Sequence, residues 1–559
     1  MKLLLLFGFV AYATASWSQY HAHHMKPGRS VMVQMFEWRF QDIAKECEDF
    51  LGPNGYGAVQ IPPIHEHVIL VRPSFNNDVI RPWYERYQVV SYKIASRSGN
   101  ADDVKDMIAR CNKAGVRIIA DAVINHMTAG LGEGTGIGGT AYDSDNYNYP
   151  GVPYVREHFN SKEKCGTQTG GIDDYDDPWQ SRVCELVGLH DLDQSHPHVR
   201  AKITEAMNEI ISFGVSGFRI DATKHIFPKD LLDIFAGLNN LTTDEFEPNS
   251  RPFMFHELSE SDRGPGKITT AEYFPTGRIL EFRYVRNLQE SFRKLNRSLS
   301  DLWDFGHAWG MMPSDTAISF IDNHDIQRGH NGDFRSAINF RDERLLKTVY
   351  TYIMSWPYGL PKVMSSYQWD QKIIKSVASV NPSGSDIEDQ NDWIGAPHDE
   401  NYNIKPVTTD ADGKCGNDWI CEHRWKEIAA MVKFRNVVGE VAVNNWWDGK
   451  SKGNPHHIAY SRGNKGFVAI NNDDNNDLKQ KLKTGLASGV YCDVISGELK
   501  GNNEHSMKIF NNNFCYFIID NKCTGKEVTV DELGWADVNV GAKDSVPAVA
   551  IHVDSKISQ

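Results

Sequence analysis

The sequence predicts an α/β protein built on a parallel barrel, with an inserted subdomain and a separate antiparallel β domain. Three observations lead to this fold class. Short apolar runs alternate with helical patterning between residues 31 and 438, four of those runs end in acidic residues, histidine or asparagine, and short strand-like runs replace the alternation after residue 441. The carboxyl ends of parallel barrel strands converge on one face, so the polar ends predict one shared cleft.

The first two strands are expected at Val31 to Phe36 and at Ala58 to Ile61. Between them, Ile43 to Leu51 has the period of an amphipathic helix, which completes a βαβ unit. The loop after the second strand carries Trp83, Tyr84 and Tyr87. Three aromatic residues in five positions favour a platform on which a ligand stacks, and the alternative is a loop that packs on itself.

The run from Val215 to Ile220 is interrupted by Arg219 and followed by Asp221, and these alternate positions share one face of a strand. Burying both charges costs several kcal/mol unless each has a partner. A structural ion pair and a functional pair explain this segment equally well. The functional interpretation gains weight because the pattern recurs at the ends of three more apolar runs, at 116–123, 252–255 and 317–321.

The regular alternation lapses from His126 to His190, which is too long for an ordinary connection. We therefore predict a subdomain inserted after the third strand. The short runs at 457–460, 466–470 and 548–553 predict a small antiparallel β domain near the C-terminus.

The chain has 559 residues and a formal net charge of −14, which argues against nucleic acid or an anionic membrane as partner. Residues 1–15 resemble a secretory signal peptide, and we expect a secreted, extracellular protein without a membrane span. Nine cysteines without paired CxxC spacing suit disulfides in an oxidising compartment, with one thiol left over. Two tripeptides, Asn240-Leu241-Thr242 and Asn296-Arg297-Ser298, match the acceptor pattern for N-glycosylation.

Four segments, 121–126, 217–225, the strand ending at Glu257, and 320–325, resemble in order and spacing the signature regions of the α-amylase family of glycoside hydrolases. Further stretches resemble animal members, with an arthropod-like character: 36–38, 86–88, 363–367, 415–425 and 491–497. The resemblance covers nearly the whole chain after the signal peptide.

The resemblance implies a (β/α)8 TIM barrel, a B subdomain after strand 3 and a C-terminal antiparallel β-sandwich. The expected divisions are a signal peptide at 1–15, barrel at 16–124, B subdomain at 125–191, barrel again at 192–441 and β domain at 442–559. The implied activity is endo-hydrolysis of α-1,4 bonds in starch, glycogen and maltooligosaccharides by a secreted monomer.

The resemblance also assigns roles. Asp221 is the expected nucleophile, Glu257 the acid/base and Asp325 a third carboxylate that binds the distorted sugar, in a retaining mechanism. Arg219 is expected to hold Asp221 ionised, with Asp121 as a structural carboxylate nearby. The expected substrate contacts are Trp83, Tyr84, Tyr87, Gln88, His126, Lys224, His225 and His324.

Two ions follow from the same comparison. One structural Ca²⁺ is expected on the side chains of Asn125 and Asp191 and the carbonyls of Arg182 and His225, because this hard cation prefers oxygen ligands. An activating Cl⁻ is expected on Arg219, Asn323 and Lys362, where animal members carry a second arginine in place of the lysine. The anion would raise the pKa of Glu257.

The implied disulfides are Cys47–Cys111, Cys165–Cys184, Cys415–Cys421 and Cys492–Cys523, which leaves Cys515 unpaired. The last pair encloses an insert, residues 498–521, that resembles nothing in the family. We interpret it as an extra hairpin or as a translated non-coding stretch.

Two other functions compete with the leading one. A related α-glucosidase or transglycosylase would share the carboxylates, and its products would distinguish it. A catalytically impaired glucan-binding homologue would lack activity, although Asp221, Glu257 and Asp325 are all present.

Overall fold

The structure is a computed structural model that describes residues 19–73, 79–259, 266–330, 337–369, 393–501, 507–510, 514–517 and 521–557. The expected signal peptide at 1–15 lies outside the described residues. None of the described helices is long and apolar enough to cross a bilayer.

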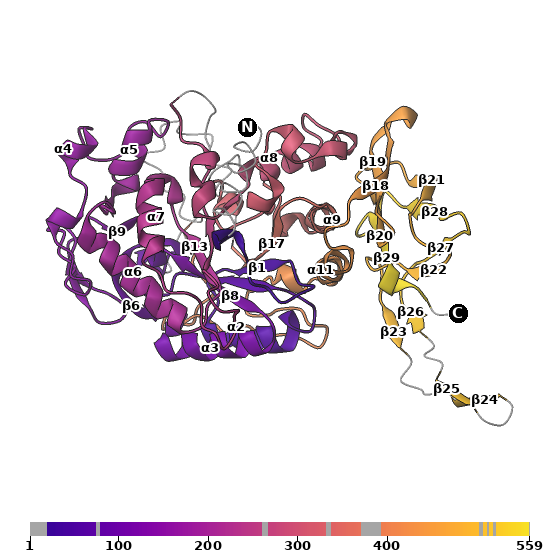
Figure 1. Cartoon of the computed structure of the whole chain (residues 1–559), viewed down its shortest axis with the longest axis horizontal. Helices are drawn as coiled ribbons and strands as arrows, with labels where there is room; N and C mark the ends of the chain where they lie inside the picture. The colour runs from indigo at the N-terminus through magenta and orange to yellow at the C-terminus, as the bar shows by residue number, and fades with distance from the viewer. Residues whose placement is uncertain are drawn as a thin grey trace, which may run out of the picture.

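Eight parallel strands close into a barrel, as predicted, and each strand pairs with the next barrel strand along the chain. The closed order confirms the (β/α)8 class (Figure 1). The strands are β1 (Met32–Met35), β2 (Ala58–Ile61), β8 (Arg117–Ala122), β13 (Gly217–Ile220), β14 (Phe253–His256), β15 (Arg278–Leu280), β16 (Ala317–Ser319) and β17 (Leu360–Ser365).

Helices follow most of the strands and cover the barrel. The helix expected at 43–51 is present but begins earlier, at Phe40, and α2 continues into a π-helical turn at Cys47–Leu51 that carries the disulfide partner of Cys111. No α-helix follows β14 in the described residues, where the 3₁₀ segment Thr270–Thr276 stands instead. The α-helices are α2 (Phe40–Glu46), α3 (Ala101–Lys113), α6 (Pro197–Ser212), α7 (Pro228–Ala236), α8 (Phe282–Phe292), α9 (Glu343–Ser355) and α11 (Lys426–Val438).

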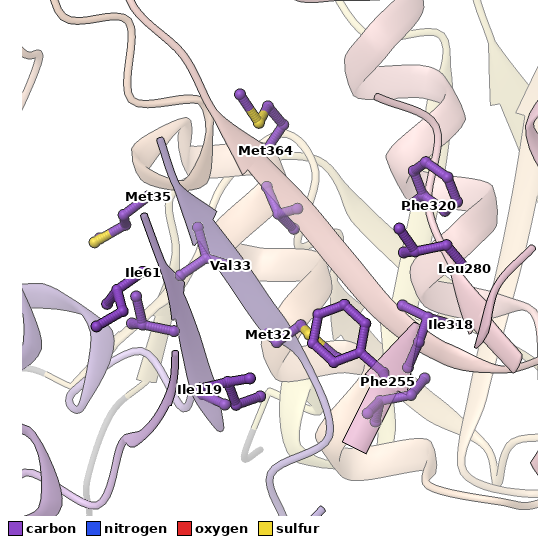
Figure 2. Packing of buried hydrophobic residues seen from close by; sticks show 14 of the residues in the cluster. Met32, Val33, Met35, Ile61, Ile119, Phe255, Leu280, Ile318, Phe320 and Met364 are labelled. Atoms are coloured by element: carbon purple, nitrogen blue, oxygen red, sulfur yellow. The ribbon is translucent and has the colours of Figure 1, made fainter. Parts of the chain in front are cut away.

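The barrel packs tightly at the start of β13. A Cβ atom on Gly217 would lie 1.9 Å from the carbonyl oxygen of Phe253 on β14, so only glycine fits there. Met32, Ile119, Phe255 and other apolar side chains fill the surrounding barrel core (Figure 2).

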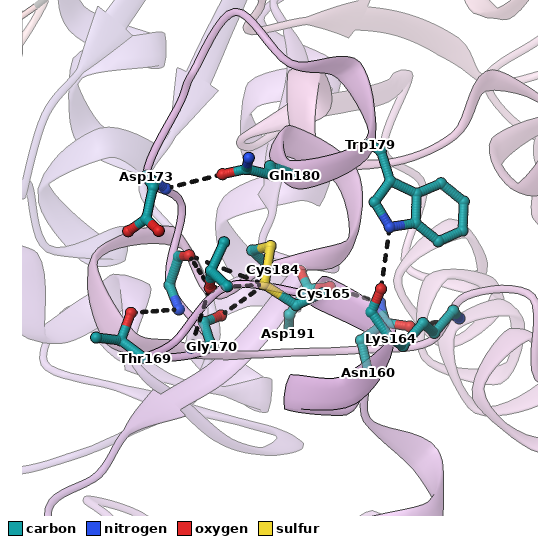
Figure 3. Close-up of a disulfide and its surroundings, with 12 residues drawn as sticks. Asn160, Lys164, Cys165, Thr169, Gly170, Asp173, Trp179, Gln180, Cys184 and Asp191 are labelled. Carbon is teal, nitrogen blue, oxygen red and sulfur yellow. Dashed lines mark hydrogen bonds between the residues drawn. A yellow bond between two sulfur atoms is a disulfide. The ribbon is translucent and has the colours of Figure 1, made fainter.

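The predicted inserted subdomain leaves and re-enters the barrel through one ribbon. Strand β9 (His126–Ala129) pairs antiparallel with β12 (Leu189–Asp191), and His126 lies opposite Asp191. Between them lie the ribbon of β10 (Glu133–Thr135) and β11 (Ala141–Asp143) and the short helices α4 (Lys162–Cys165) and α5 (Pro178–Val183). The Cys165–Cys184 disulfide links α4 to the end of α5 (Figure 3).

The C-terminal region is antiparallel, as predicted. A four-stranded sheet runs in the order β18 (Val443–Gly449), β19 (Asn454–Arg462), β20 (Gly466–Asn471) and β29 (Ala548–His552). Ribbons β21–β28 (Leu478–Lys483, Trp535–Val540) and β22–β27 (Gly489–Cys492, Glu527–Val530) share a second apolar core with this sheet. The two layers form the expected β-sandwich.

All four disulfides are the pairs that the resemblance implies. The insert after Cys492 begins and ends in a ribbon of β23 (Leu499–Gly501) and β26 (Asn521–Cys523). Beyond it, β24 (Met507–Phe510) pairs antiparallel with β25 (Phe514–Phe517), which contains Cys515. This ribbon projects from the C-terminal domain, so the insert has the hairpin pairing of the first interpretation (Figure 1).

Three histidines pack where the inserted subdomain meets the start of α6. The ring of His158 lies 4.5 Å from that of His198 and 4.9 Å from that of His196, between centroids. His158 Nδ1 accepts the Val155 N–H at 2.9 Å, and His196 Nδ1 accepts the His198 N–H at 3.2 Å as the N-cap of α6. Both bonds need a neutral imidazole.

We predict that acid destabilises this contact. Burial, then His198 and His196, lower the pKa of His158, although Glu157 lies 3.8 Å from its Nε2 and opposes the shift. A lowered folded-state pKa means that the stabilisation is complete above the unfolded value of 6.5 and is lost as pH falls below it. His158→Asn should therefore lower Tm at pH 7.5, with about 1 kcal/mol of lost capping, but by less at pH 5. Scanning calorimetry at both pH values measures this, with exposed His307→Gln as control; equal losses at the two pH values would contradict it.

Candidate functional site

One buried guanidinium joins three of the four polar strand ends. Arg219 Nη1 lies 2.7 Å from Asp121 Oδ1 and 2.7 Å from Asp221 Oδ1, while its Nη2 lies 2.7 Å from Glu257 Oε2. The arginine is 2% exposed. Since β8, β13 and β14 are neighbours in the barrel, the register places these groups at one edge. The sequence left a structural and a functional ion pair as alternative explanations. Both apply, because Arg219 joins adjacent strands and two of its carboxylate partners line the cleft.

Asp325 joins the group from the end of β16. It shares a side-chain hydrogen bond with Glu257, and its Oδ2 lies 3.5 Å from His324 Nε2. The Ala222 N–H donates to Glu257 Oε2 at 3.2 Å, so backbone from β13 also orients this carboxyl group. The structure thus brings together the three carboxylates that the sequence singled out.

The charges set an order of proton affinity among these groups that differs from expectation. Burial raises the pKa of Asp221 well above its usual value; Arg219 lowers it, but Glu257 and Asp121 raise it further. Burial also raises the pKa of Glu257, yet Arg219, the Ala222 N–H, Asp325 and Lys362 together bring it below its usual value. Burial and Glu257 raise the pKa of Asp325 to about 7. Arg219 favours ionised Asp221 as predicted, but it does not outweigh the other contributions.

These groups open into a cleft of about 580 Å³. Every residue that lines the cleft lies in a segment that follows the carboxyl end of a barrel strand in the sequence. This is the face of the barrel at which the polar strand ends predicted a shared cleft. Of the expected substrate contacts, all but Gln88 line the cleft; the Gln88 side chain instead accepts the Ala129 N–H at 3.1 Å and holds β9. The lining residues are Trp83, Tyr84, Tyr87, His126, Tyr175, Leu186, Val187, Leu189, Asp221, Ala222, Lys224, His225, Glu257, Ser259, His324, Asp325 and His330.

The sequence did not point to several of these residues. Tyr175, Leu186 and Val187 belong to the inserted subdomain, whose irregular sequence has no period from which orientation could be inferred. His330 follows the fourth polar strand end closely in the chain, and that proximity was the available signal.

The aromatic loop both packs on itself and faces the cleft. Trp83 and Tyr87 contact each other with centroids 5.9 Å apart, and Tyr87 stacks on His324 at 5.6 Å. Tyr87 Oη donates to Asp121 Oδ2 at 3.2 Å, which ties the loop to the charged cluster.

Three histidines of the cleft, His126, His225 and His324, are neutral hydrogen-bonding groups. Burial lowers the pKa of His126 and of His225 to about 4, and that of His324 well below its usual value. Backbone carbonyls orient the first two: His126 Nε2 donates to Tyr87 at 2.9 Å and His225 Nδ1 to Ser181 at 2.6 Å. His324 Nδ1 accepts from Gln34 Nε2 at 3.0 Å.

The two side chains expected to bind calcium each keep one buried oxygen without a hydrogen-bond partner. These are Asn125 Oδ1 and Asp191 Oδ1, on the ribbon that joins the inserted subdomain to the barrel. Burial raises the pKa of Asp191 well above its usual value, so an anionic form needs a compensating cation. Within the described residues, no group of three or more His, Cys, Asp or Glu side chains could hold a metal ion. A cation here would rely on one carboxylate together with amide and carbonyl oxygens, which suits Ca²⁺.

Lys362 lies inside the barrel and is 1% exposed. Its Nζ donates to Gln34 Oε1 at 2.6 Å and is 3.4 Å from Gln60 Oε1, so its direct partners are neutral. Burial, followed by the charge of Arg219, lowers its pKa to about 7. Two buried cations that repel each other are compatible with an anion, and Asn323, the third expected ligand, is also buried.

Comparisons with known proteins match both halves of the chain. The model of the α-amylase catalytic domain matches residues 67–254, and that of the α-amylase C-terminal all-β domain matches residues 447–554. An α-amylase of the mite Dermatophagoides pteronyssinus is 45% identical over 96% of this chain and 100% of its own length. The pancreatic α-amylase of Sus scrofa is 44% identical over the full length of both chains.

Solved structures agree. A mutant of α-amylase I from Eisenia fetida, in complex with maltohexaose, superposes with a TM-score of 0.82 at 37% identity and covers 96% of this chain and 99% of its own. A γ-cyclodextrin glucanotransferase from an alkalophilic Bacillus clarkii, at 18% identity and a TM-score of 0.60, shows likeness of fold alone.

Two non-glycine residues that line the cleft, Ala222 and Val187, have a left-handed backbone conformation. Val187 has φ 47° and ψ 32°, a conformation that a β-branched residue rarely adopts, and the residue is 76% exposed and lines the cleft. Such strain costs of order 1–3 kcal/mol and is concentrated at functional sites.

We predict that Val187→Gly stabilises the protein, by up to about 1 kcal/mol after the greater chain entropy of glycine is subtracted. Thermal unfolding measures the effect. The matched control is Val155→Gly, since Val155 is also exposed in this subdomain but has φ −135°, where glycine only weakens the chain. A lower Tm for Val187→Gly than for the parent would contradict the strain.

Proposed function

The chain belongs to the α-amylase family of glycoside hydrolases, and we propose that it is a secreted endo-acting enzyme that cleaves the α-1,4 bonds of starch and glycogen with retention. The observation that carries the proposal is that Asp221 and Glu257, which both line the cleft, bind one buried guanidinium. A shared guanidinium keeps two carboxyl groups close, and retaining glycosidases need about 5–5.5 Å between them.

In the first half of the proposed reaction, Asp221 attacks the anomeric carbon while Glu257 protonates the oxygen of the leaving sugar. The C–O bond to the leaving chain breaks and a glycosyl ester of Asp221 forms. In the second half, ionised Glu257 takes a proton from water, which displaces Asp221 and restores both groups. Asp325 would hydrogen-bond the sugar that is distorted between these steps.

The reaction needs Asp221 ionised and Glu257 protonated, the reverse of the order that the described charges favour. Arg219, Asn323 and Lys362 would hold a chloride ion, and its negative charge would oppose the two cations that lower the pKa of Glu257. Raising that pKa would make Glu257 the acid. Since one proton is shared within a tight carboxylate group, a proton on Glu257 also favours ionised Asp221.

The remaining substrate contacts are assigned to other residues that line the cleft. Trp83, Tyr84 and Tyr87 would stack on glucose rings, and neutral His126, His225 and His324 would bind their hydroxyl groups. Lys224 also lines the cleft and would bind maltooligosaccharides there.

One calcium ion would supply positive charge to the unpaired oxygens of Asn125 and Asp191, together with the carbonyls of Arg182 and His225. Its position on the β9–β12 ribbon supports a structural role, because it would fix the inserted subdomain beside the cleft. The four disulfides support export to an oxidising compartment, and we propose that the protein acts there as a monomer.

The first test is hydrolysis of starch by the purified protein. Asp221→Asn should lower kcat by about 10³-fold or more, because it removes the nucleophile. Exposed Asp412→Asn is the control and should match the parent. Maltose and maltotriose as main products support the endo-acting enzyme, glucose would favour the α-glucosidase, and a folded parent without activity would leave a glucan-binding homologue.

The chloride proposal predicts a pH dependence. Because the pKa of Lys362 is about 7, its charge is present below pH 7 and is lost above it. The chloride concentration for half-maximal activation should therefore rise about tenfold per pH unit above 7. Lys362→Arg should remove this dependence, since arginine keeps its charge. Activity that ignores chloride at pH 6 in dialysed buffer would refute the anion site.

Removal of calcium should lower the unfolding temperature. An ion present at about 1,000 times its Kd stabilises the folded state by about 4 kcal/mol, which corresponds to several degrees for a protein of this size. The measurement compares Tm with excess Ca²⁺ and with a chelator, and Asn125→Ala should reduce the difference. A parent with the same Tm in both buffers would exclude the site.

A further inference from the structure

Two tripeptides have no part in the proposed catalytic function. Asn240-Leu241-Thr242 and Asn296-Arg297-Ser298 are the two Asn-x-Ser/Thr patterns without proline in the 559-residue sequence. The pattern alone occurs by chance in many proteins, so its significance depends on where the asparagines lie in the folded chain.

Asn240 lies in the connection between α7 and β14 and is exposed. The neighbouring Leu241 anchors this loop, since it is 2% exposed and its N–H donates to the Ser250 carbonyl at 2.8 Å. Arg251 Nη1 donates to Asn240 Oδ1 at 3.2 Å. That contact uses the amide oxygen, so Nδ2, the atom that carries an N-linked glycan, can be substituted without breaking it.

Asn296 lies in the connection that follows α8 and is also exposed. Its two neighbours in the pattern are held: the Arg297 guanidinium lies 4.5 Å from the centroid of Trp309, and Ser298 Oγ donates to Asp301 Oδ2 at 2.9 Å. The preceding Leu295 is 57% exposed, so a glycan here would cover apolar surface.

Both connections run from a helix to the next strand. In a parallel barrel such connections lie at the amino ends of the strands, whereas every residue that lines the cleft follows a strand. Glycans on Asn240 and Asn296 would therefore project from the face opposite the cleft and leave substrate access unchanged.

We propose that Asn240 and Asn296 are N-glycosylated and that neither glycan takes part in catalysis. The donor class is an oligosaccharide linked to a lipid diphosphate. Asparagine Nδ2 attacks C1 of the first sugar, the C1–N bond forms as the C1–O bond to the diphosphate breaks, and the amide loses one proton while the lipid diphosphate leaves. The inference rests on the proposed export of the chain.

The test uses the full chain expressed in cultured mammalian cells and recovered from the medium. Intact mass is measured before and after peptide:N-glycosidase F, which removes each glycan and converts its asparagine to aspartate. The parent should lose two glycans. Asn240→Gln and Asn296→Gln should each lose one, Thr242→Ala should behave as Asn240→Gln, and Thr242→Ser should retain the glycan.

Several outcomes would overturn the proposal. An exported parent in which Asn240 or Asn296 is unmodified refutes that site. A fall in kcat/KM of more than about twofold in the double variant, at unchanged Tm, refutes the placement away from the cleft. A chain that is retained in the cells refutes the proposed export and not the glycosylation sites. In that case, residues 1–15 are replaced by an established signal peptide, and the exported variant still tests both asparagines. Starch hydrolysis by the parent is scored separately, so failure of the catalytic proposal is distinguishable.

Discussion

The guanidinium of Arg219 is the interaction on which the candidate site depends. Taking one such ion out of water costs several kcal/mol, and three carboxylates from adjacent strands compensate that cost. The same arrangement makes the carboxylates dependent on one another, because each proton that binds one of them changes the charge that the others experience. A barrel interior filled only with apolar side chains would be easier to form, but it could not hold two carboxyl groups in different protonation states.

Much of this arrangement could be predicted from the sequence, for a physical reason. Barrel strands are short apolar runs, so a charge such as Arg219 or Glu257 at the end of one stands out, and parallel topology brings those ends together. Six of the eight strands, the ends of the inserted segment and the antiparallel C-terminal region follow from local patterns of this kind, whereas β15 and β17 were expected only from the eightfold barrel that the resemblance implies. The helix at 43–51 was also predicted, but its change to a π-helical turn at Cys47–Leu51 was not, because that turn leaves no distinct signal in the apolar period.

Other features depend on packing between distant segments and could not be predicted. Gln88 adjoins the aromatic loop in sequence, yet its amide oxygen accepts a hydrogen bond from β9. The orientation of its side chain is therefore set by a strand much later in the chain. Val187 lies in the cleft because an irregular segment is constrained by a disulfide on one side and by β12 on the other. The order of proton affinity among Asp221, Glu257 and Asp325 is a sum over many buried charges, which residue identities alone do not give.

The β9–β12 ribbon has a consequence for how this architecture can vary. Because the inserted subdomain leaves and returns through paired residues, His126 opposite Asp191, its two ends are fixed side by side whatever lies between them. Segments of different length and shape can occupy that interval without altering the register of the eight barrel strands. Evolution can therefore replace the inserted subdomain, which forms part of the cleft lining, as a unit. The carboxylates that the barrel itself positions keep their geometry.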